Sequence, residues 1–363
     1  MKTYNNLFDK IVDIENVKKA IIEASKGKRK KESVQKTLAN IDGVAGLISN
    51  QLKNGTWRPK QIHNVKQIND GIALKKRNII CPDFVQEQIV HHAILRVCSP
   101  LFMKKFYRHS YGSVPKRGKE EAIKNIHKVI QNSSKAKYFS VIDIHHFFES
   151  TTPLVSFRAI RKTISDKRVL LLYFLILHNN LVRFPDGTIK RNGLLMGMFT
   201  SPWVANVVLN KVDHIFKDDD GIYFMARYMD DIIIIDSNKR KMMKSLNNAQ
   251  NYLSTIGLRL KKTPQIHKID NVAISFIGAT ITREKSVMRP LTFLRAKRIA
   301  KRISKKDKIS IFDARRILSI SGQFKHLNTY QAYKKYINIY VNKRKCRQIV
   351  SKKEREINAM DKK

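Results

Sequence analysis

Apolar and polar positions alternate along the chain with both helical and strand-like periods. Apolar residues recur every three or four positions over residues 34–53 and 83–97, which predicts two amphipathic helices. A basic break at residues 26–31 separates the first of these from an earlier helical segment, and Ser99-Pro100 is expected to end the second. Further helices are expected over residues 167–184, 201–216 and 239–256.

Short β-rich runs lie between the helical segments. Residues 62–68 and 79–81 flank Asn69-Asp70-Gly71, a sequence typical of a hairpin turn. The apolar run 138–142 ends at Asp143, and the runs 222–227 and 232–235 enclose two adjacent aspartates. We also expect a turn at Asp186-Gly187, a loop over 193–200, and a strand or hairpin over 272–282.

This mixture predicts an α+β fold with a boundary near residue 285. From residue 291 to the end there are 22 Lys and Arg against 5 Asp and Glu, and eight basic residues lie in 295–308. We therefore expect a domain over residues 1–285 and a basic helical domain over 286–363. Solvated lysines are the ordinary explanation of such a charged helix, but the single sign of the excess favours nucleic-acid contact. The tail, 343–363, is expected to be mobile and to bind RNA or an acidic partner.

The charge of the chain points to a polyanionic partner. Its 363 residues carry 72 Lys and Arg and 29 Asp and Glu, a net charge of +43, yet 42% are hydrophobic, which excludes a disordered basic tail. Nucleic acid is therefore expected ahead of a membrane surface. The three cysteines are too few for a disulfide framework, and no apolar run approaches the ~20 residues that span a bilayer. We expect a cytoplasmic protein without a membrane partner.

Asp230-Asp231 needs an explanation in so basic a chain. An isolated Asp-Asp pair is usually a solvated turn, and Asp218-Asp219-Asp220-Gly221 is interpreted as such a polar loop. Asp230-Asp231, however, lies between apolar strands, where unpaired carboxylates repel and lose solvation. If the strand ending at Asp143 is a neighbour, three carboxylates converge in an arrangement suited to two Mg²⁺ ions about 4 Å apart.

These motifs together resemble reverse transcriptases. Residues 228–231 (YMDD) resemble the catalytic hairpin, and 143–148 (DIHHFF) the first catalytic motif. Residues 197–209 (GMFTSPWVANVVL) are similar to the loop and helix before the hairpin. Lys262-Thr263 and 276–278 (FIG) resemble the basic motif and the primer grip that follow it. The motifs occur in the family's order, and the resemblance covers roughly residues 5–335.

The resemblance implies a right-hand polymerase architecture: fingers and palm with an antiparallel palm sheet, then a helical basic thumb. It implies RNA-templated addition of dNTPs by two-Mg²⁺ phosphoryl transfer. The catalytic residues would be Asp143, Asp230 and Asp231, and the carbonyl of Ile144 would be a further metal ligand. The non-enzymatic alternative is an inactive relative that only binds RNA. It is disfavoured because all three acids are present.

Other roles follow by position in the motifs. The residues expected at the nucleotide are Lys75, Arg77, Phe148, Met196, Gly197 and Lys262. Those expected at nucleic acid are Arg117, Tyr228, Gly278, Arg295, Arg298 and Arg302. Phe148 would pack under the sugar and exclude a 2′-hydroxyl, whereas Phe147 is assigned to the core. Gly197 would let the backbone approach the templating base pair. His91-His92 is assigned to packing and hydrogen bonding.

Within the family, three features resemble the diversity-generating retroelement group. They are the segments 75–93 and 107–118, the end of the thumb at 319–330, and Met196, where many relatives have Gln. Ser201-Pro202 departs from that group and is typical of group II intron and retron enzymes. The partners implied are an RNA template, an RNA–DNA hybrid and a small basic helical accessory protein, in a bacterial or phage-encoded system. A group II intron-like, retron-like or phage-defence enzyme stays open.

Overall fold

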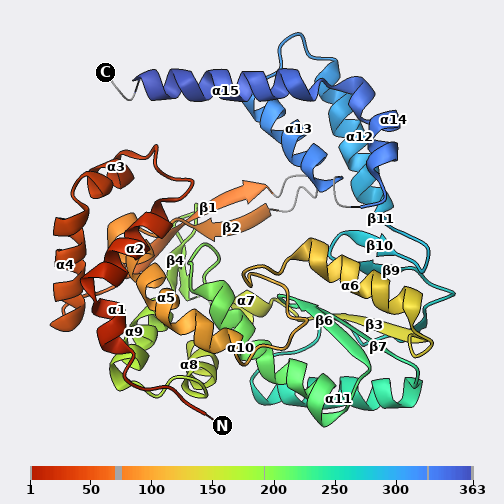
Figure 1. Ribbon diagram of the computed structural model, residues 1–363, viewed down its shortest axis with the longest axis horizontal. Coiled ribbons are helices and arrows are strands. Elements are labelled where there is room, and N and C mark those ends of the chain that lie inside the picture. Colours follow the sequence, from red (N-terminus) through yellow and green to blue (C-terminus); the bar gives the residue numbers. More distant parts are fainter. Residues whose placement is uncertain (1, 70–75, 192, 325–326, 361–363) are drawn as a thin grey trace. The chain divides into compact units, whose positions relative to one another are not determined.

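The computed structural model describes residues 2–69, 76–191, 193–324 and 327–360 (Figure 1). Helices and strands are mixed along the chain, as expected for an α+β protein. The chain forms two compact units. The first unit comprises Met1–Gln67, Asn78–Ala122 and Ser140–Ile266, and the second Ile68–Arg77, Ile123–Phe139 and His267–Lys363. The expected domain boundary at 285/286 falls inside the second unit and stays a prediction.

The chain begins with a helical layer. Its helices are α1 (Phe8–Val12), α2 (Ile14–Ser25), α3 (Glu32–Ala39) and α4 (Ile41–Lys53). The expected basic break lies between α2 and α3. The single helix predicted over 34–53 was wrong, because it is interrupted at Asn40. The Asn40 side chain accepts a hydrogen bond from the Gly43 amide at 3.2 Å and so caps a new helix, α4.

The next helix runs through a proline. A π-helical turn, η1 (Phe84–Gln88), leads into α5 (Ile89–Met103), which packs against α2. The predicted end at Ser99-Pro100 was wrong, since Pro100 lies inside α5. Proline removes one hydrogen bond and tends to break helix interiors, but here it lies in the last turn. The turn is completed by the Lys104 amide, which donates to the Pro100 carbonyl at 3.3 Å.

A small mixed sheet follows, and most of its residues belong to the first unit. Its strands are β1 (Ile62–Asn69), β2 (Lys76–Ile80), β4 (Leu181–Arg183) and β5 (Ile189–Arg191), in the order β2-β1-β4-β5. The expected Asn69-Asp70-Gly71 turn lies largely outside the described residues. Two helices, α8 (Pro153–Arg161) and α9 (Lys167–His178), precede β4. The helix predicted over 167–184 is thus too long, because residues 181–183 pair with both β1 and β5. The turn at Asp186-Gly187 is confirmed, with Gly187 at φ +84°.

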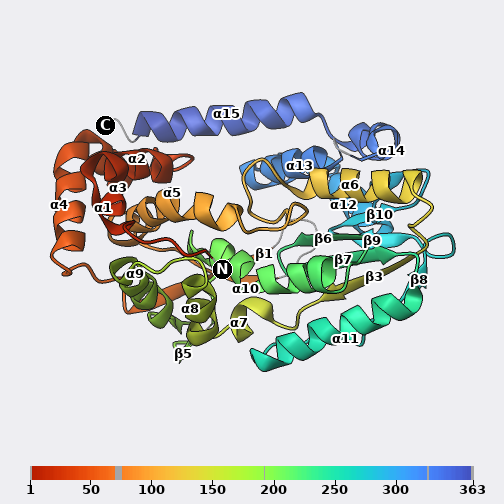
Figure 2. The same cartoon turned by 60° about the horizontal axis from the view of Figure 1, so that its bottom comes forward.

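The sheet that carries the acidic motifs has the order β6-β7-β3-β8. Its strands are β3 (Tyr138–Asp143), β6 (Phe224–Tyr228), β7 (Asp231–Asp236) and β8 (His267–Lys268). The β6–β7 and β3–β8 pairs are antiparallel. The helices that precede or follow these strands are α6 (Lys119–Asn132), α7 (Phe147–Ser150), α10 (Ser201–His214) and α11 (Lys239–Thr255). The α11 helix packs against β7 (Figure 2), whose residues Ile232–Ile235 are fully buried.

The polar loop expected at 218–221 is only partly a loop. Residues Ile215–Asp219 form a π-helical turn, η2, that continues α10. Asp220 follows it and accepts hydrogen bonds from Ser245 and Asn248 of α11. The Asp220 carboxylate therefore joins this turn to α11 through hydrogen bonds.

The second unit ends the chain. A three-stranded sheet, β9 (Ile274–Phe276), β10 (Ala279–Ile281) and β11 (Ser286–Met288), has the order β11-β10-β9. It is followed by α12 (Pro290–Ser304), α13 (Ile311–Gln323), α14 (Tyr330–Tyr336), η3 (Asn338–Tyr340) and α15 (Lys343–Met360). The α13 and α15 helices pack together (Figure 2). Residues 343–360 of the tail are helical, and the expected mobility and RNA binding of the tail stay predictions. No helix in the described parts of the chain is long and apolar enough to cross a membrane.

Candidate active site

The three predicted catalytic acids lie at adjoining strand ends. Asp143 is the last residue of β3 and Asp231 is the first residue of β7, and these strands are neighbours in the sheet. Asp230 precedes Asp231 in the β6–β7 turn. All three side chains are half-buried. The sequence prediction that these carboxylates come together agrees with this arrangement.

Lys261 lies beside the three acids. Its ammonium donates a 2.5 Å hydrogen bond to the Asp143 carboxylate, with 53% and 32% of the two side chains exposed. That hydrogen bond and the Asp143 charge raise the pKa of Lys261, burial opposes them, and the charges of Asp231 and Asp230 add to the increase. The negative potential of all three aspartates therefore acts on one cationic group.

A backbone bridge sets Lys261 in this position. Ile144 and Leu260 are antiparallel bridge partners, with the Lys261 amide donating to the Asp143 carbonyl at 2.8 Å and the His145 amide to Arg259 at 2.9 Å. Backbone groups of successive residues in an extended chain point to opposite sides, so the Ile144 carbonyl points away from this bridge. Lys262, which the sequence analysis places at the nucleotide, is the next residue and is exposed, and its role stays a prediction.

The hairpin between the strands has a strained tip. Tyr228 pairs with Asp231, which leaves a two-residue turn, Met229-Asp230. Met229 has φ +58°, in the left-handed region that residues other than glycine seldom occupy. A neighbouring loop approaches it so closely that a Cβ on Gly112 would lie 2.5 Å from the Met229 nitrogen. The conformation of this turn is therefore imposed by its surroundings.

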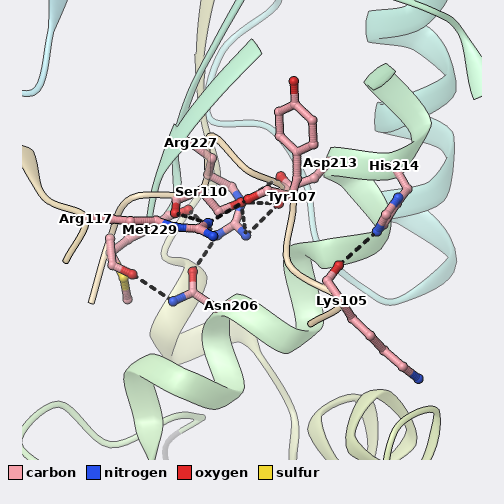
Figure 3. Close-up of polar contacts among 10 residues, drawn as sticks. Lys105, Tyr107, Ser110, Arg117, Asn206, Asp213, His214, Arg227 and Met229 are labelled. Carbon is pink, nitrogen blue, oxygen red and sulfur yellow. Dashed lines mark hydrogen bonds and ion pairs between the residues drawn. The ribbon is translucent and has the colours of Figure 1, made fainter. Parts of the chain in front are cut away.

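Beneath the turn, Arg227 forms a buried ion pair with Asp213 (Figure 3). Both side chains are fully buried, and Arg227 Nε and Nη2 donate to the two Asp213 oxygens at 2.7 Å each. Arg227 Nη1 donates to Asn206 Oδ1 at 2.7 Å and to the Met229 carbonyl at 3.2 Å. Ser110 donates to Asp213 at 2.7 Å. The sequence analysis missed this cluster; a basic residue inside the apolar run 222–227 was the available signal.

Arg117 is used within the chain. Its guanidinium donates to the carbonyls of Tyr107 at 2.9 Å and Ser110 at 3.1 Å (Figure 3). Burial lowers the pKa of Arg117, with Arg108 adding to this effect and Tyr111 opposing it. The expected contact of Arg117 with nucleic acid stays a prediction, whereas its hydrogen bonds to the 107–110 segment are observed.

The two adjacent phenylalanines after Asp143 differ in burial. Phe147 is 2% exposed and belongs to the core, as expected, whereas Phe148 is half-buried. The Phe148 carbonyl accepts a 2.7 Å hydrogen bond from the Leu194 amide. A Cβ on Gly193 would lie 2.2 Å from the same carbonyl, so the 193–200 loop packs against α7.

Gly197 is required by the fold itself. It has φ +113°, and a Cβ there would lie 2.2 Å from the Ile80 carbonyl. The half-buried Met196 accepts a 2.9 Å hydrogen bond from the Ile80 amide through its carbonyl. The neighbour that excludes a side chain at Gly197 is therefore the protein's own β2 strand, a reason that the sequence analysis did not consider.

The remaining predicted contacts are dispersed. Lys75 lies outside the described residues, Arg77 is exposed on β2, and Tyr228 is half-buried at the end of β6. Gly278, with φ +82°, forms the β9–β10 turn with Ile277. On α12 three arginines are exposed opposite the buried Ala296, Ile299, Ala300 and Ile303: Arg295, Arg298 and Arg302.

The adjacent histidines pack as expected. His91 is fully buried, with its Nδ1 3.4 Å from the Thr200 hydroxyl. His92 stacks on Phe199 with a ring-centroid distance of 3.7 Å. The pair therefore joins α5 to the loop that precedes α10.

Carboxylate oxygens are the ligands that Mg²⁺ prefers, and one cation, the Lys261 ammonium, already lies against the Asp143 carboxylate. Their chemistry therefore fits magnesium. In the described part of the chain, however, no group of three or more His, Cys, Asp and Glu is arranged to hold a metal ion. One oxygen of the Asp143 carboxylate pairs with Lys261, so a metal ion at Asp143 would compete with this ammonium.

Comparison with known sequences gives a family match. The family described as reverse transcriptase (RNA-dependent DNA polymerase) matches residues 51–281, which include all three acids. Protein YkfC of Escherichia coli is 23% identical over 186 residues, 50% of this chain and 48% of that protein. A COX1/OXI3 intron 1 protein of Saccharomyces cerevisiae is 24% identical over 195 residues, 52% of this chain and 22% of that protein. The matches thus cover less than half of either relative.

One solved structure of low sequence identity shares the fold. The RNA-dependent RNA polymerase of a human picobirnavirus, an insertion-loop deletion mutant, superposes with a TM-score of 0.53 at 12% identity. The match covers 80% of this chain and 59% of that polymerase. Apo telomerase from Candida tropicalis gives a TM-score of 0.49 at 12% identity, covering 78% of this chain and 60% of that one.

Proposed function

The chain belongs to the reverse transcriptase family, and we propose that it is an RNA-templated DNA polymerase that adds dNTPs to a primer. The observation that carries this proposal is the meeting of Asp143 and Asp231 at the ends of adjacent strands. Carboxylates gathered at adjoining strand ends repel one another, and bound cations relieve that repulsion.

The acids would hold two magnesium ions, with Asp143 and Asp230 as ligands, the Ile144 carbonyl completing the set and Asp231 adding charge. Bound magnesium would activate the primer hydroxyl and neutralise the triphosphate. The chain's own cations, Lys75, Arg77 and Lys262, would bind phosphate oxygens. Phe148 would pack under the sugar, with Met196 and Gly197 beside the nascent base pair.

The second unit would hold the RNA–DNA hybrid. Arg295, Arg298 and Arg302 recur at intervals of three and four residues on α12, so one exposed stripe of the helix carries three positive charges. Such a stripe suits the phosphates of an A-form duplex. Gly278, Tyr228 and Arg117 would each contact nucleic acid.

Within the family we assign the chain to the diversity-generating retroelement group, in a bacterial or phage-encoded cytoplasmic system with a small basic accessory protein. Met196 supports this assignment, and Ser201-Pro202 favours the group II intron and retron enzymes instead. Sequencing the products made on an adenine-containing RNA template separates the two. The retroelement assignment requires frequent misincorporation opposite adenine, and copying that is equally accurate at all four template bases would exclude it.

Primer extension tests the activity. The purified chain, an RNA template with a DNA primer, dNTPs and Mg²⁺ should give extended products. Asp230→Asn should reduce the rate at least about 1,000-fold, because a metal ligand at the reacting centre is lost. Full activity in this variant would refute the mechanism. RNA binding by the wild-type chain without extension would instead support the non-catalytic alternative.

A further inference from the structure

Arg227 has a saturated hydrogen-bonding environment. Its side chain is fully buried, and its five N–H groups can be assigned to Asp213, Asn206, Ser110 and the Met229 carbonyl. A guanidinium presents five donors in a rigid planar fork. The five hydrogen bonds therefore fix the orientation of the guanidinium and the positions of the partner atoms around it.

The cluster ties two distant segments, α10 and residues 107–112, to the hairpin that carries Asp230 and Asp231. Asn206 and Asp213 lie on α10, two turns apart on one face, and Arg227 lies on β6 (Figure 3). The 107–112 segment joins through Ser110, which is also a parallel bridge partner of Arg227. Asn206 donates from Nδ2 to the Gly112 carbonyl at 2.8 Å. Gly112 in turn lies against the backbone of Met229.

Two contacts therefore hold the hairpin tip, one at the Met229 carbonyl and one at the Met229 nitrogen. Arg227 Nη1 binds the Met229 carbonyl, while Gly112, held by Asn206, blocks movement of the Met229 nitrogen. The left-handed backbone at Met229 costs roughly 1–3 kcal/mol and persists only where its surroundings determine it. Asp230 and Asp231 follow Met229 directly, so their direction depends on this turn.

Stability alone does not account for such a cluster. A buried ion pair is often no more stabilising than apolar residues of similar volume, because the charges lose solvation. Its advantage is a defined geometry. We propose that Arg227, Asp213, Asn206 and Ser110 form a positioning cluster that fixes the Met229 turn and thereby orients Asp230 and Asp231. The catalytic consequence rests on the proposed polymerase function; the structural consequence does not.

The double variant Arg227→Met/Asp213→Leu tests this inference. It replaces the ion pair by apolar side chains, so the fold should survive with a melting temperature near that of the wild type. Hydrogen exchange in the 226–233 peptide should accelerate at least about tenfold, because the Met229 turn is released. The Mg²⁺ concentration for half-maximal primer extension should rise at least fivefold, with KM for dNTP unchanged.

The matched control is Lys211→Met/Asp219→Leu. It removes an ion pair that also starts from α10, between Lys211 and Asp219, but is solvent-exposed. This control should leave hairpin exchange and the Mg²⁺ requirement unchanged. A folded Arg227→Met/Asp213→Leu variant that behaves like the control would overturn the inference, since the cluster would then be structural only.

A milder variant keeps the inference testable if Arg227→Met/Asp213→Leu does not fold. Asn206→Ser retains the Arg227–Asp213 pair but is too short to reach the Gly112 carbonyl. It should accelerate exchange of the same peptide at least threefold, and unchanged exchange would likewise overturn the inference. If the wild-type chain does not extend primers, the proposed function fails, while the exchange measurements still decide whether the cluster positions the hairpin.

Discussion

Lys261 is bound to Asp143 by a 2.5 Å hydrogen bond that joins residues 118 positions apart in the chain. Half of the Lys261 side chain is exposed, so this ion pair contributes only about 0–1 kcal/mol. A divalent cation can therefore displace the ammonium at small cost. The contact holds the Asp143 carboxylate against the Lys261 ammonium until such a cation arrives.

Lys261→Met removes the competing ammonium. We expect the variant to bind divalent cations about two- to fivefold more tightly, the factor that corresponds to an exposed ion pair of up to 1 kcal/mol. Titration calorimetry with Mg²⁺ measures this change. The control is Lys262→Met, which removes an exposed lysine from the next position. Weaker binding in Lys261→Met than in the control would show that Lys261 does not compete for Asp143.

Gly112→Ala should distort the hairpin tip. The added methyl would lie 2.5 Å from the Met229 nitrogen and 2.8 Å from its sulfur, so the turn must move. We expect primer extension to fall at least tenfold and the 226–233 peptide to exchange faster. Gly118→Ala is the control, because a Cβ at Gly118 meets nothing within 4 Å. Equal activity of the two variants would contradict the close packing of Gly112 on Met229.

Gly197→Ala should destabilise the first unit. Alanine at φ +113° is strained, and its Cβ would lie 2.2 Å from the Ile80 carbonyl. We expect a loss of at least about 2 kcal/mol, seen as a lower melting temperature. Gly46→Ala on α4 has open space, and it should instead stabilise by up to about 1 kcal/mol through helix propensity. A Gly197→Ala protein as stable as wild type would refute the close approach to β2.

His91 should make the fold acid-sensitive. Burial lowers the pKa of this histidine to about 4, with Glu87 opposing and His92 and His63 adding to the decrease. The unfolded chain, with a histidine pKa near 6.5, then binds the proton first. The contribution of neutral His91 to the free energy of unfolding is therefore fully present above about pH 6.5. It is lost as the pH falls to 4, and the loss amounts to about 3 kcal/mol.

His91→Gln should reduce that loss. Melting temperatures measured between pH 7 and pH 4 should fall less steeply in the variant than in the wild type. His178→Gln, which changes an exposed histidine on α9, should leave the pH profile unchanged. Identical slopes for His91→Gln and the wild type would show that His91 does not contribute to the acid sensitivity.

The acidic site could be predicted from the sequence because its parts are local. The YMDD run between apolar strands specifies a hairpin with acids at its tip, and β3 ends at Asp143 through its own apolar pattern. Neighbouring strands then bring these ends together. The β1–β4 pairing, by contrast, is non-local, and residues 181–183 are too few for a strand to stand out beside the helical run before them.

The buried polar residues that support the hairpin could not be predicted, because their contacts are also non-local. Arg227 is a cation in an apolar strand, and nothing in its local pattern names Asp213, Asn206 or Ser110 as partners. Helix boundaries at Asn40 and Pro100 were also mispredicted. The apolar period continues across the cap at Asn40, and it does not indicate that Pro100 lies within the last turn of a helix. Segment identity was thus easier to predict than helix boundaries or buried polar contacts.

Binding of Mn²⁺, followed by electron paramagnetic resonance, tests the central claim that Asp143, Asp230 and Asp231 form one cation site. With primer–template and dNTP present, the wild-type chain should bind about two Mn²⁺ ions. Asp143→Asn and Asp230→Asn should each weaken binding at least tenfold, while Asp186→Asn in the exposed β4–β5 turn should bind like the wild type. Wild-type Mn²⁺ binding in both Asp143→Asn and Asp230→Asn would contradict the account.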